Sequence, residues 1–150
     1  MSLTMSGMPL ELEPQSLEDF DMVEACPFCQ LEPSRVILST GLLRVVWDKY
    51  PVSPGHALIV PARHVETWFE LDREEQLEVI SAIDEVRQII EVEHAPAGYN
   101  IGINSGEAAG QTVPHLHVHV IPRYAGDVGD PRGGVRWVIP DEADYWSDPD

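Results

Sequence analysis

The sequence predicts a single domain of mixed α and β structure, in which several short strands accompany one long helix. Three stretches lead to this prediction. Residues 115–121 alternate histidine with aliphatic side chains, which is the period of a half-buried strand. Residues 42–60 hold two apolar runs around a loop with two prolines and a glycine, as in a long-looped hairpin. Residues 72–94 place apolar side chains at helical spacing.

Strands are predicted where aliphatic, β-branched and aromatic residues gather between turn residues. They are residues 35–39, 42–47, 56–60, 99–104 and 115–121. Gly41 marks the turn between the first two, and Pro51, Pro54 and Gly55 break the chain before the third. Residues 1–20 are polar and acidic, and we expect a flexible arm there. A chain of 150 residues is long enough to bury one core without disulfides.

One long amphipathic helix is predicted between residues 72 and 94. Asp72 suits the N-cap position, and Glu75 three residues later completes a capping box. The apolar residues expected on one buried stripe are Val79, Ile80, Ile83, Val86 and Ile90. Pro96 ends the helix. We interpret His94, in the last turn, as a helix-end or solvated residue rather than a ligand.

The charge balance limits the partners of this chain. Nine basic residues against 26 acidic residues give a formal net charge of -17, which disfavours nucleic acid and anionic membranes. An anionic small molecule remains compatible where a pocket supplies local donors. The first 20 residues lack the pattern of a secretory signal, and no stretch approaches the roughly 20 apolar residues of a membrane span. We therefore expect a cytoplasmic protein.

The two cysteines, Cys26 and Cys29, form a CxxC motif. In a thioredoxin-like protein this motif follows a strand and opens a long helix. Here a short polar segment and strand-like residues follow, which favours a zinc knuckle over a redox dithiol; two unrelated thiols are the third interpretation. Zinc takes four ligands in a tetrahedron, so two further ligands must come from elsewhere in the chain.

The histidines His115, His117 and His119 share one face of the last predicted strand, because successive side chains point to opposite faces. Three imidazoles suit a core poorly, since each brings nitrogens that need partners. Either all three bind one metal, or one is a nucleophile or general base that the others assist. The small residues of 105–112 are compatible with a phosphate-binding loop or an ordinary turn. With no acidic residue beside the histidines, the second alternative is favoured.

Three motifs together resemble the histidine-triad (HIT) superfamily. They are the HxHxH-apolar-apolar stretch His115–Ile121, the preceding Gly110–Val113, and Pro54–Pro61. The similarity covers Cys26 to Tyr124, and residues 123–140 are similar to bacterial members near the dinucleoside polyphosphate hydrolase branch. The resemblance implies an α+β fold: an antiparallel sheet of about five strands with the long helix across one face, in a two-fold homodimer. It divides the chain into the arm, a HIT domain at 21–140 and an acidic tail at 141–150.

The resemblance also implies roles for individual residues. His117 would be the nucleophile that takes the nucleotidyl group, and His119 would stabilise charge on the phosphoryl and leaving-group oxygens. Thr112 would act with them, and His56 would support the site from behind. The nucleotide-binding residues implied in this way are Asp48, Asn104, Gly110, Gln111, Thr112 and His119.

The resemblance extends to the CxxC motif. Its implied partners are His64 and His115, which together with Cys26 and Cys29 would form a structural Cys2His2 zinc site. Such a closed site keeps no open position for catalysis, and the family mechanism requires no catalytic metal.

The family comprises nucleotide hydrolases and transferases that act at the α-phosphorus. We predict hydrolysis of dinucleoside polyphosphates, such as diadenosine tetraphosphate, to release a nucleoside monophosphate. A nucleoside phosphoramidase and a non-catalytic nucleotide-binding protein are the alternatives. A phosphorylase or nucleotidyl transferase differs only in the acceptor that attacks the intermediate. The expected partners are a purine nucleotide and a second copy of the chain, without nucleic acid or membrane.

Overall fold

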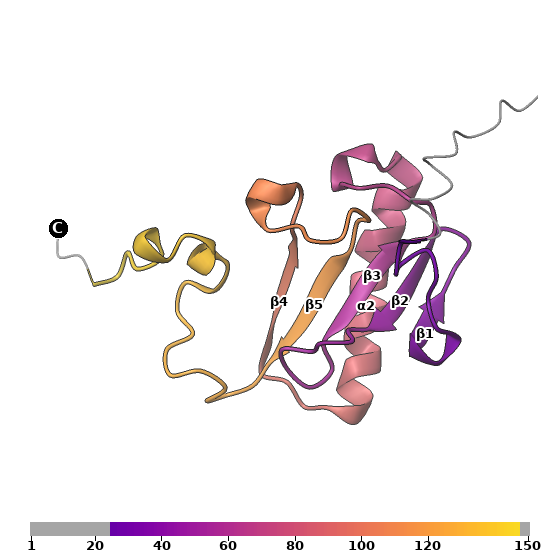
Figure 1. The fold of residues 1–150 in the computed structure, drawn as a ribbon. Helices are drawn as coiled ribbons and strands as arrows, with labels where there is room; N and C mark the ends of the chain where they lie inside the picture. Colours follow the sequence, from indigo (N-terminus) through magenta and orange to yellow (C-terminus); the bar gives the residue numbers. More distant parts are fainter. Residues whose placement is uncertain (1–24, 148–150) are drawn as a thin grey trace, which may run out of the picture.

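A computed structural model describes residues 25–147 of the chain, so the arm predicted at residues 1–20 and the last three residues of the tail lie outside it. The predicted five-stranded antiparallel sheet is confirmed, in the order β1-β2-β3-β5-β4 (Figure 1). The strands are β1 (Val36–Ser39), β2 (Leu43–Trp47), β3 (Ala57–Pro61), β4 (Gly98–Ile103) and β5 (Val118–Arg123). Within residues 25–147, no helix combines the length and apolar character needed to cross a bilayer.

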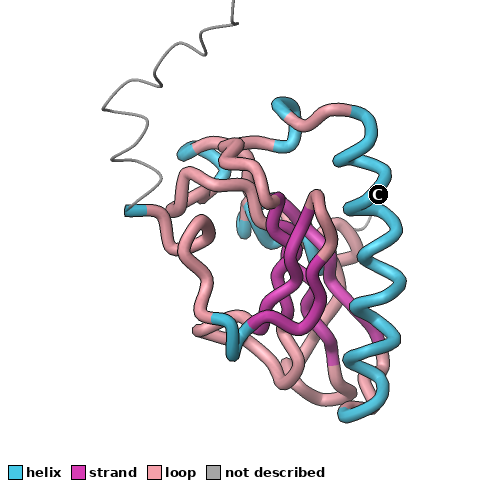
Figure 2. The backbone as a smooth tube through the Cα atoms, turned by 90° about the vertical axis from the view of Figure 1, so that its right-hand side faces the viewer, coloured by secondary structure: helices cyan, strands magenta, loops and turns pink. Residues whose placement is uncertain are grey.

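The helix α2 (Arg73–Glu93) covers one face of the sheet (Figure 2). Asp72 is its N-cap and forms the predicted capping box with Glu75. The helical residues buried in the main core are Val79, Ala82, Val86 and Ile90. The prediction was wrong for Ile80, which is 56% exposed. Ile80 lies a third of a turn from Val79, whereas Ala82 is three residues from Val79 and four from Val86, on the buried stripe.

The long loop between β2 and β3 is tied to β5. The Ser53 hydroxyl donates to the Pro122 carbonyl at 2.6 Å, and the Tyr124 hydroxyl donates to the Pro54 carbonyl at 2.6 Å. Gly55 has a φ of +85°, and a Cβ on it would lie 2.9 Å from Cδ2 of His94. A side chain at this position would therefore meet both a backbone penalty and a collision. These hydrogen bonds hold the loop, and Asp48 and His56 lie at its two ends.

The histidine segment enters the sheet later than predicted. Strand β5 begins at Val118, so His115 and His117 precede it. Pro114 lacks an N–H for a sheet ladder, and the Leu116 N–H donates instead to the Val65 carbonyl at 2.7 Å. The expected alternation of side chains still holds, because the intervening aliphatic residues are buried in the core beneath α2.

The face of the sheet away from α2 has two parts. Over β2 and β3 it is covered by the N-terminal turn, where Cys26 and Phe28 pack on Val46, Leu58 and Val60. Over β4 and β5 it forms one wall of a cavity of about 820 Å³.

Residues 130–147 form a small C-terminal lobe, which stands off beyond β4 in Figure 1. It contains η4 (Gly134–Val138) and η5 (Pro140–Glu142). The Arg132 guanidinium lies over the Trp146 ring, and that of Arg136 lies over the Tyr145 ring, both at 4.8 Å. Across residues 25–147, no hydrogen bond joins this lobe to the rest of the chain. The contacts of the two arginines join residues on both sides of position 140. The predicted boundary between a HIT domain at 21–140 and a tail at 141–150 stays a prediction.

Candidate functional site

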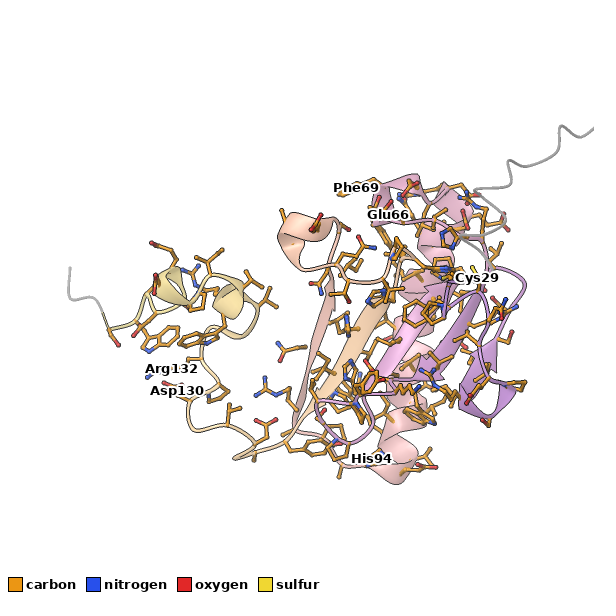
Figure 3. The ribbon with its side chains drawn as sticks, in the orientation of Figure 1. Cys29, Glu66, Phe69, His94, Asp130 and Arg132 are labelled. Atoms are coloured by element: carbon orange, nitrogen blue, oxygen red, sulfur yellow. The ribbon has the colours of Figure 1, made fainter. Side chains whose placement is uncertain are left out.

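Four residues that are distant in sequence meet at the N-terminal turn: Cys26, Cys29, His64 and His115. The His115 Nδ1 lies 3.4 and 3.5 Å from the two cysteine Sγ atoms, and the His64 Nδ1 lies 3.1 Å from Cys29 Sγ. The two Nδ1 atoms are 3.1 Å apart. A tetrahedral zinc ion gives about 3.6 Å between sulfur and nitrogen ligands and about 3.3 Å between nitrogens. The cluster therefore fits a zinc ion; Cys29, at its edge, is labelled in Figure 3.

The protonation of this cluster also suits a metal. The His115 Nε2 lies 2.9 Å from the Pro61 carbonyl, which can only accept, so Nε2 carries the proton and Nδ1 offers its lone pair to the cluster. Burial lowers the pKa of His115 to about 4, which keeps the ring neutral. Burial raises the pKa of the Cys29 thiol to about 11 in the metal-free cluster, so a binding cation must displace its proton.

His117 is fixed in one tautomer by the backbone beside it. Its Nδ1 lies 2.8 Å from the His115 carbonyl, so Nδ1–H donates and Nε2 keeps a free lone pair. Its ring packs between those of Phe28 and His119, with centroids 5.0 and 5.1 Å away. A held imidazole with an unprotonated Nε2 has the form of a nitrogen nucleophile.

His119 is fixed in the complementary way, through His56. The Val52 N–H donates to His56 Nδ1 at 3.2 Å, so the proton of the neutral His56 ring is on Nε2. That Nε2 lies 2.9 Å from His119 Nδ1, which must accept. His119 therefore carries its own proton on Nε2 and can donate it in a hydrogen bond. Burial is the main cause that lowers the pKa of His56 and brings the pKa of His119 to about 4, so both rings are neutral at pH 7.

Asp48 lies beside His56, although no acidic residue is near the three histidines in sequence. Its Oδ2 lies 3.4 Å from His56 Nε2, and its Oδ1 accepts the Tyr50 N–H at 2.8 Å. Asp48, His56 and His119 lie close enough together to hold a cation. However, His56 would have to lose its Nε2 proton while Nδ1 still accepts from Val52, which demands an imidazolate. We therefore interpret His56 and His119 as a hydrogen-bonded pair with the Asp48 carboxylate beside it.

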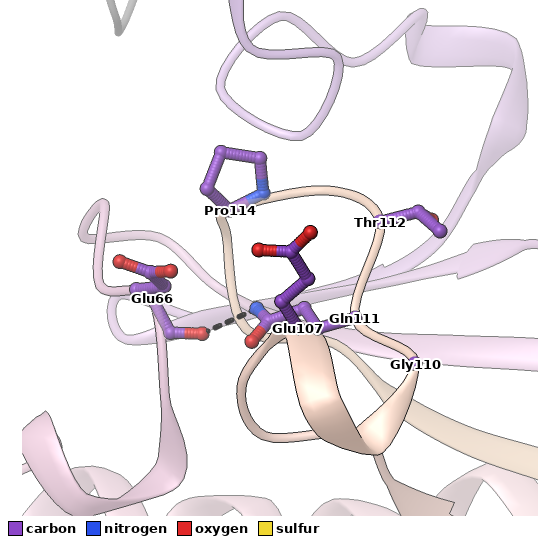
Figure 4. A pocket seen from close by; sticks show the side chains of 6 residues that line it. All are labelled: Glu66, Glu107, Gly110, Gln111, Thr112 and Pro114. Atoms are coloured by element: carbon purple, nitrogen blue, oxygen red, sulfur yellow. Dashed lines mark hydrogen bonds between the residues drawn. The ribbon is translucent and has the colours of Figure 1, made fainter.

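The loop with the predicted phosphate-binding residues opens to a separate hollow of about 510 Å³. Figure 4 shows its lining, which is Glu66, Glu107, Gly110, Gln111, Thr112 and Pro114. The Gln111 amide is engaged on both ends: Oε1 accepts the Gly106 N–H at 2.8 Å, and Nε2 donates to the Glu66 carbonyl at 2.7 Å. Its backbone N–H donates to the Gly106 carbonyl. In this conformation the Gln111 side chain braces the loop, and its predicted contact with phosphate stays a prediction.

The larger cavity, of about 820 Å³, contains other members of the predicted site. His56, Asn104 and His119 line it on the sheet side. On the far side it is lined by Val135, Trp137 and Val138 of the C-terminal lobe. The structure thus separates Asn104 from Gly110 and Thr112, which open to the other hollow.

Several groups of the site escaped sequence reasoning. The carbonyls of Pro61 and His115 and the N–H of Val52 fix the tautomers, and backbone groups leave no mark in a sequence. Trp137 lines the cavity although it lies after the last strand. The glycines around it and the tryptophan itself were the available signal, since they mark a segment with a special backbone and a large apolar side chain.

The chain is similar to two enzymes of known name. It is 38% identical over 97 residues to a bis(5'-nucleosyl)-tetraphosphatase [asymmetrical] of Schizosaccharomyces pombe, covering 65% of this chain and 53% of that protein. It is 35% identical over 109 residues to an AP-4-A phosphorylase of Mycobacterium tuberculosis, covering 69% and 56%. The chain thus spans about half the length of these relatives.

Two solved structures share the fold. A HIT-family protein from Bacillus subtilis superposes with a TM-score of 0.64 at 33% identity, over 71% of this chain and 78% of that one. A zinc-bound histidine triad family protein from Mycobacterium smegmatis gives 0.64 at 26% identity, over 81% and 95%. The family model for the HIT domain matches residues 30–126. As this match covers well over half of the sequence, the chain belongs to the HIT domain family.

Proposed function

We propose that this protein is a nucleotide hydrolase that cleaves dinucleoside polyphosphates, such as diadenosine tetraphosphate, through a nucleotidyl-His117 intermediate. The observation that carries the proposal is the pair of opposite tautomers: His117 presents a lone pair on Nε2, and the neighbouring His119 presents a proton on Nε2. One ring can attack while the other donates to the oxygens of the same phosphate. The two relatives named above act on this class of substrate, according to their names.

In the first step, Nε2 of His117 forms a bond to the α-phosphorus and the bond from phosphorus to the bridging oxygen breaks. The leaving polyphosphate takes the electron pair of that bond, and the Nε2–H of His119 stabilises the charge that develops. As Nε2 becomes bonded, the ring gains positive charge, which the Nδ1–H bond to the His115 carbonyl disperses.

In the second step, water attacks the phosphorus and the P–N bond breaks. The electron pair returns to His117 Nε2, the water proton leaves to solvent, and a nucleoside monophosphate is released. Two steps with a good nitrogen leaving group replace one direct displacement. Phosphate in place of water would make the same intermediate yield a nucleoside diphosphate, as expected for a phosphorylase.

Further residues are assigned to the nucleotide in this proposal. Asp48 accepts the ribose hydroxyls, and Asn104, Gly110 and Thr112 hold phosphate oxygens as the loop closes on the substrate. His56 positions His119. Gln111, whose side chain braces the loop, is proposed to contact the phosphates as well.

We also propose that Cys26, Cys29, His64 and His115 hold one structural zinc ion. The four ligands close the coordination sphere, so the ion stabilises the N-terminal turn and offers no open position. Metal analysis should find about one zinc per chain. A Cys29→Ser variant should lose the zinc ion and melt at a lower temperature. The control variant Ser39→Ala should keep the zinc ion and the wild-type melting temperature. A wild type without zinc would reject the assignment.

A two-fold homodimer belongs to the same proposal. Strand β4 is at the edge of the sheet, where its outer N–H and C=O groups can pair with a second β4. Light scattering should give twice the chain mass. We also propose a cytoplasmic location, because both cysteines belong to the proposed zinc cluster and form no disulfide.

Incubation with diadenosine tetraphosphate, followed by quenching and mass spectrometry, tests the reaction. The wild type should carry a nucleotidyl adduct on His117, and His117→Ala should lack both adduct and turnover. Adenosine phosphoramidate serves as the comparison substrate. A preference for it would favour the phosphoramidase alternative, and an adduct on another residue would reject the proposed nucleophile.

A further inference from the structure

We propose that Phe28, which lies between the two cysteines in sequence, is a positioning residue for the proposed nucleophile, His117. Its ring holds the His117 imidazole in the orientation in which Nε2 faces the phosphorus. This inference rests on the proposed function, in which His117 attacks, and Phe28 is not among the site residues predicted from sequence. Phe28 itself acts only through the histidine and forms no bond to the phosphate or the leaving group.

The Phe28 ring is in contact with two histidine rings. The ring centroids of Phe28 and His117 are 5.0 Å apart, with an angle of 41° between the ring planes. The centroids of Phe28 and His115 are 5.9 Å apart at 70°, which is close to an edge-to-face arrangement. Both distances are in the range of favourable aromatic pairs, which contribute more than their buried area alone. One ring therefore contacts the proposed nucleophile and a proposed zinc ligand together.

The His117 ring needs such a contact, because its hydrogen bond does not fix it completely. The bond from Nδ1–H to the His115 carbonyl, at 2.8 Å, sets the tautomer and holds one corner of the ring. The χ2 torsion of histidine has a broad preference, so packing must select the tilt of the plane. The aromatic neighbours that can do so are Phe28 and His119, and His119 is assigned to the phosphate oxygens. Phe28 carries no polar side-chain atom, so its role toward His117 is one of packing.

The Phe28 ring is itself held on two sides. Phe28 and His117 are each only 9% exposed. The ring packs on apolar side chains of β2 and β3, which are Val46, Leu58 and Val60. Its backbone belongs to a turn in which the Gln30 N–H donates to the Cys26 carbonyl at 3.2 Å. A ring held in this way can keep a neighbouring imidazole in place during a reaction.

The test compares Phe28→Leu, which keeps an apolar side chain without a ring, with Phe28→Tyr, which keeps the ring. Cleavage of diadenosine tetraphosphate is measured in single turnovers with enzyme in excess. We expect Phe28→Leu to be about tenfold slower than the wild type, because a loosely oriented nucleophile loses rate. Phe28→Tyr should recover most of the rate. The affinity for adenosine monophosphate, measured by calorimetry, should stay at the wild-type value in both variants.

Val60→Ala is the matched control for the apolar cluster. Val60 is fully buried and packs in the same cluster as Phe28, but it carries no ring to place against His117. This variant should lower Tm through the loss of buried methyl groups and keep the wild-type cleavage rate. Metal analysis of the same proteins should give the wild-type zinc content in Phe28→Leu, Phe28→Tyr and Val60→Ala.

A second measurement needs no turnover. Carbon-13 relaxation of labelled histidine rings reports their picosecond-to-nanosecond motion in the free protein. The His117 ring should be more mobile in Phe28→Leu than in the wild type, and it should keep the wild-type motion in Val60→Ala. A purely structural Phe28 would lower Tm on replacement but change neither the ring motion nor the cleavage rate.

A wild-type cleavage rate in Phe28→Leu, or an unchanged motion of the His117 ring, would overturn the inference. A weaker affinity for adenosine monophosphate with an unchanged rate would show that Phe28 contacts the nucleoside instead. An equal rate defect in Val60→Ala or Phe28→Tyr, or loss of zinc in Phe28→Leu, would also overturn it, because the effect would then belong to the whole cluster. Failure of the proposed function is separate: the wild type would form no adduct on His117, while the motion of that ring would still depend on Phe28.

Discussion

Replacing His56 by alanine tests whether His56 fixes the tautomer of His119. In the wild type, the Val52 N–H leaves His56 with its proton on Nε2, and this proton occupies Nδ1 of His119. Without His56, nothing requires His119 to carry its proton on Nε2. A His119 ring with its proton on Nδ1 would turn an Nε2 lone pair toward the phosphate oxygens. That lone pair would repel the oxygens, whereas the Nε2–H of the wild type would donate a hydrogen bond to them.

The size of the effect follows from the lost hydrogen bond. A neutral hydrogen bond contributes about 0.5–1.5 kcal/mol net, and a buried acceptor left unpaired costs about 1–3 kcal/mol. Each 1.36 kcal/mol of activation free energy is about a factor of ten in rate. Because the His119 interaction strengthens as charge develops, we expect His56→Ala to lower kcat about 10- to 100-fold with little change in KM.

The assay is steady-state cleavage of diadenosine tetraphosphate, combined with ¹⁵N NMR of the histidine side chains. His56→Gln keeps an N–H donor near the original Nε2, and it should recover part of the rate. The NMR spectra should show His119 protonated at Nε2 in the wild type and as a mixture in His56→Ala. A wild-type His119 protonated at Nδ1, or a His56→Ala variant within twofold of the wild-type kcat, would refute the reasoning.

Three further predictions concern the stability of the fold. Gly55→Ala should lower the free energy of unfolding by about 1–2 kcal/mol in urea titrations, because residue 55 has a φ of +85° and a Cβ would meet His94; Gly41→Ala, in open space, is the control. Glu75→Gln should cost about 1.5 kcal/mol at pH 7, since the Arg63 hydrogen bond lowers the pKa of Glu75. That difference should be complete above pH 4.5 and vanish as the pH falls through the lowered pKa; a pH-independent difference would contradict this assignment. Removing the proposed zinc ion with a chelator should lower the Tm of the wild type and leave that of Cys29→Ser unchanged.

The elements of the fold could be predicted because their signals are local. The capping box at Asp72 and the alternation through residues 115–121 each depend on neighbours in sequence, and both are present in the structure. The Ile80 prediction failed because helical spacing tolerates several stripes, and only packing against the sheet selects the one that includes Ala82.

The candidate site was predictable only in part. Residue types and their spacing revealed the histidine motif and the CxxC motif, and the family resemblance supplied His64 as a partner of the cysteines. Asp48 beside His56 and the engagement of Gln111 depend on how loops fold in space. The tautomers depend on backbone carbonyls and N–H groups that every sequence contains, so no residue type indicates them.

His115 belongs to both centres of this molecule. Its imidazole is turned into the Cys2His2 cluster, and its own carbonyl oxygen holds the ring of His117. Only one intervening residue separates the two rings, and Leu116 is anchored in the core. A change in the cysteine cluster, such as oxidation of its thiols, would therefore act within two peptide units of the proposed nucleophile, His117.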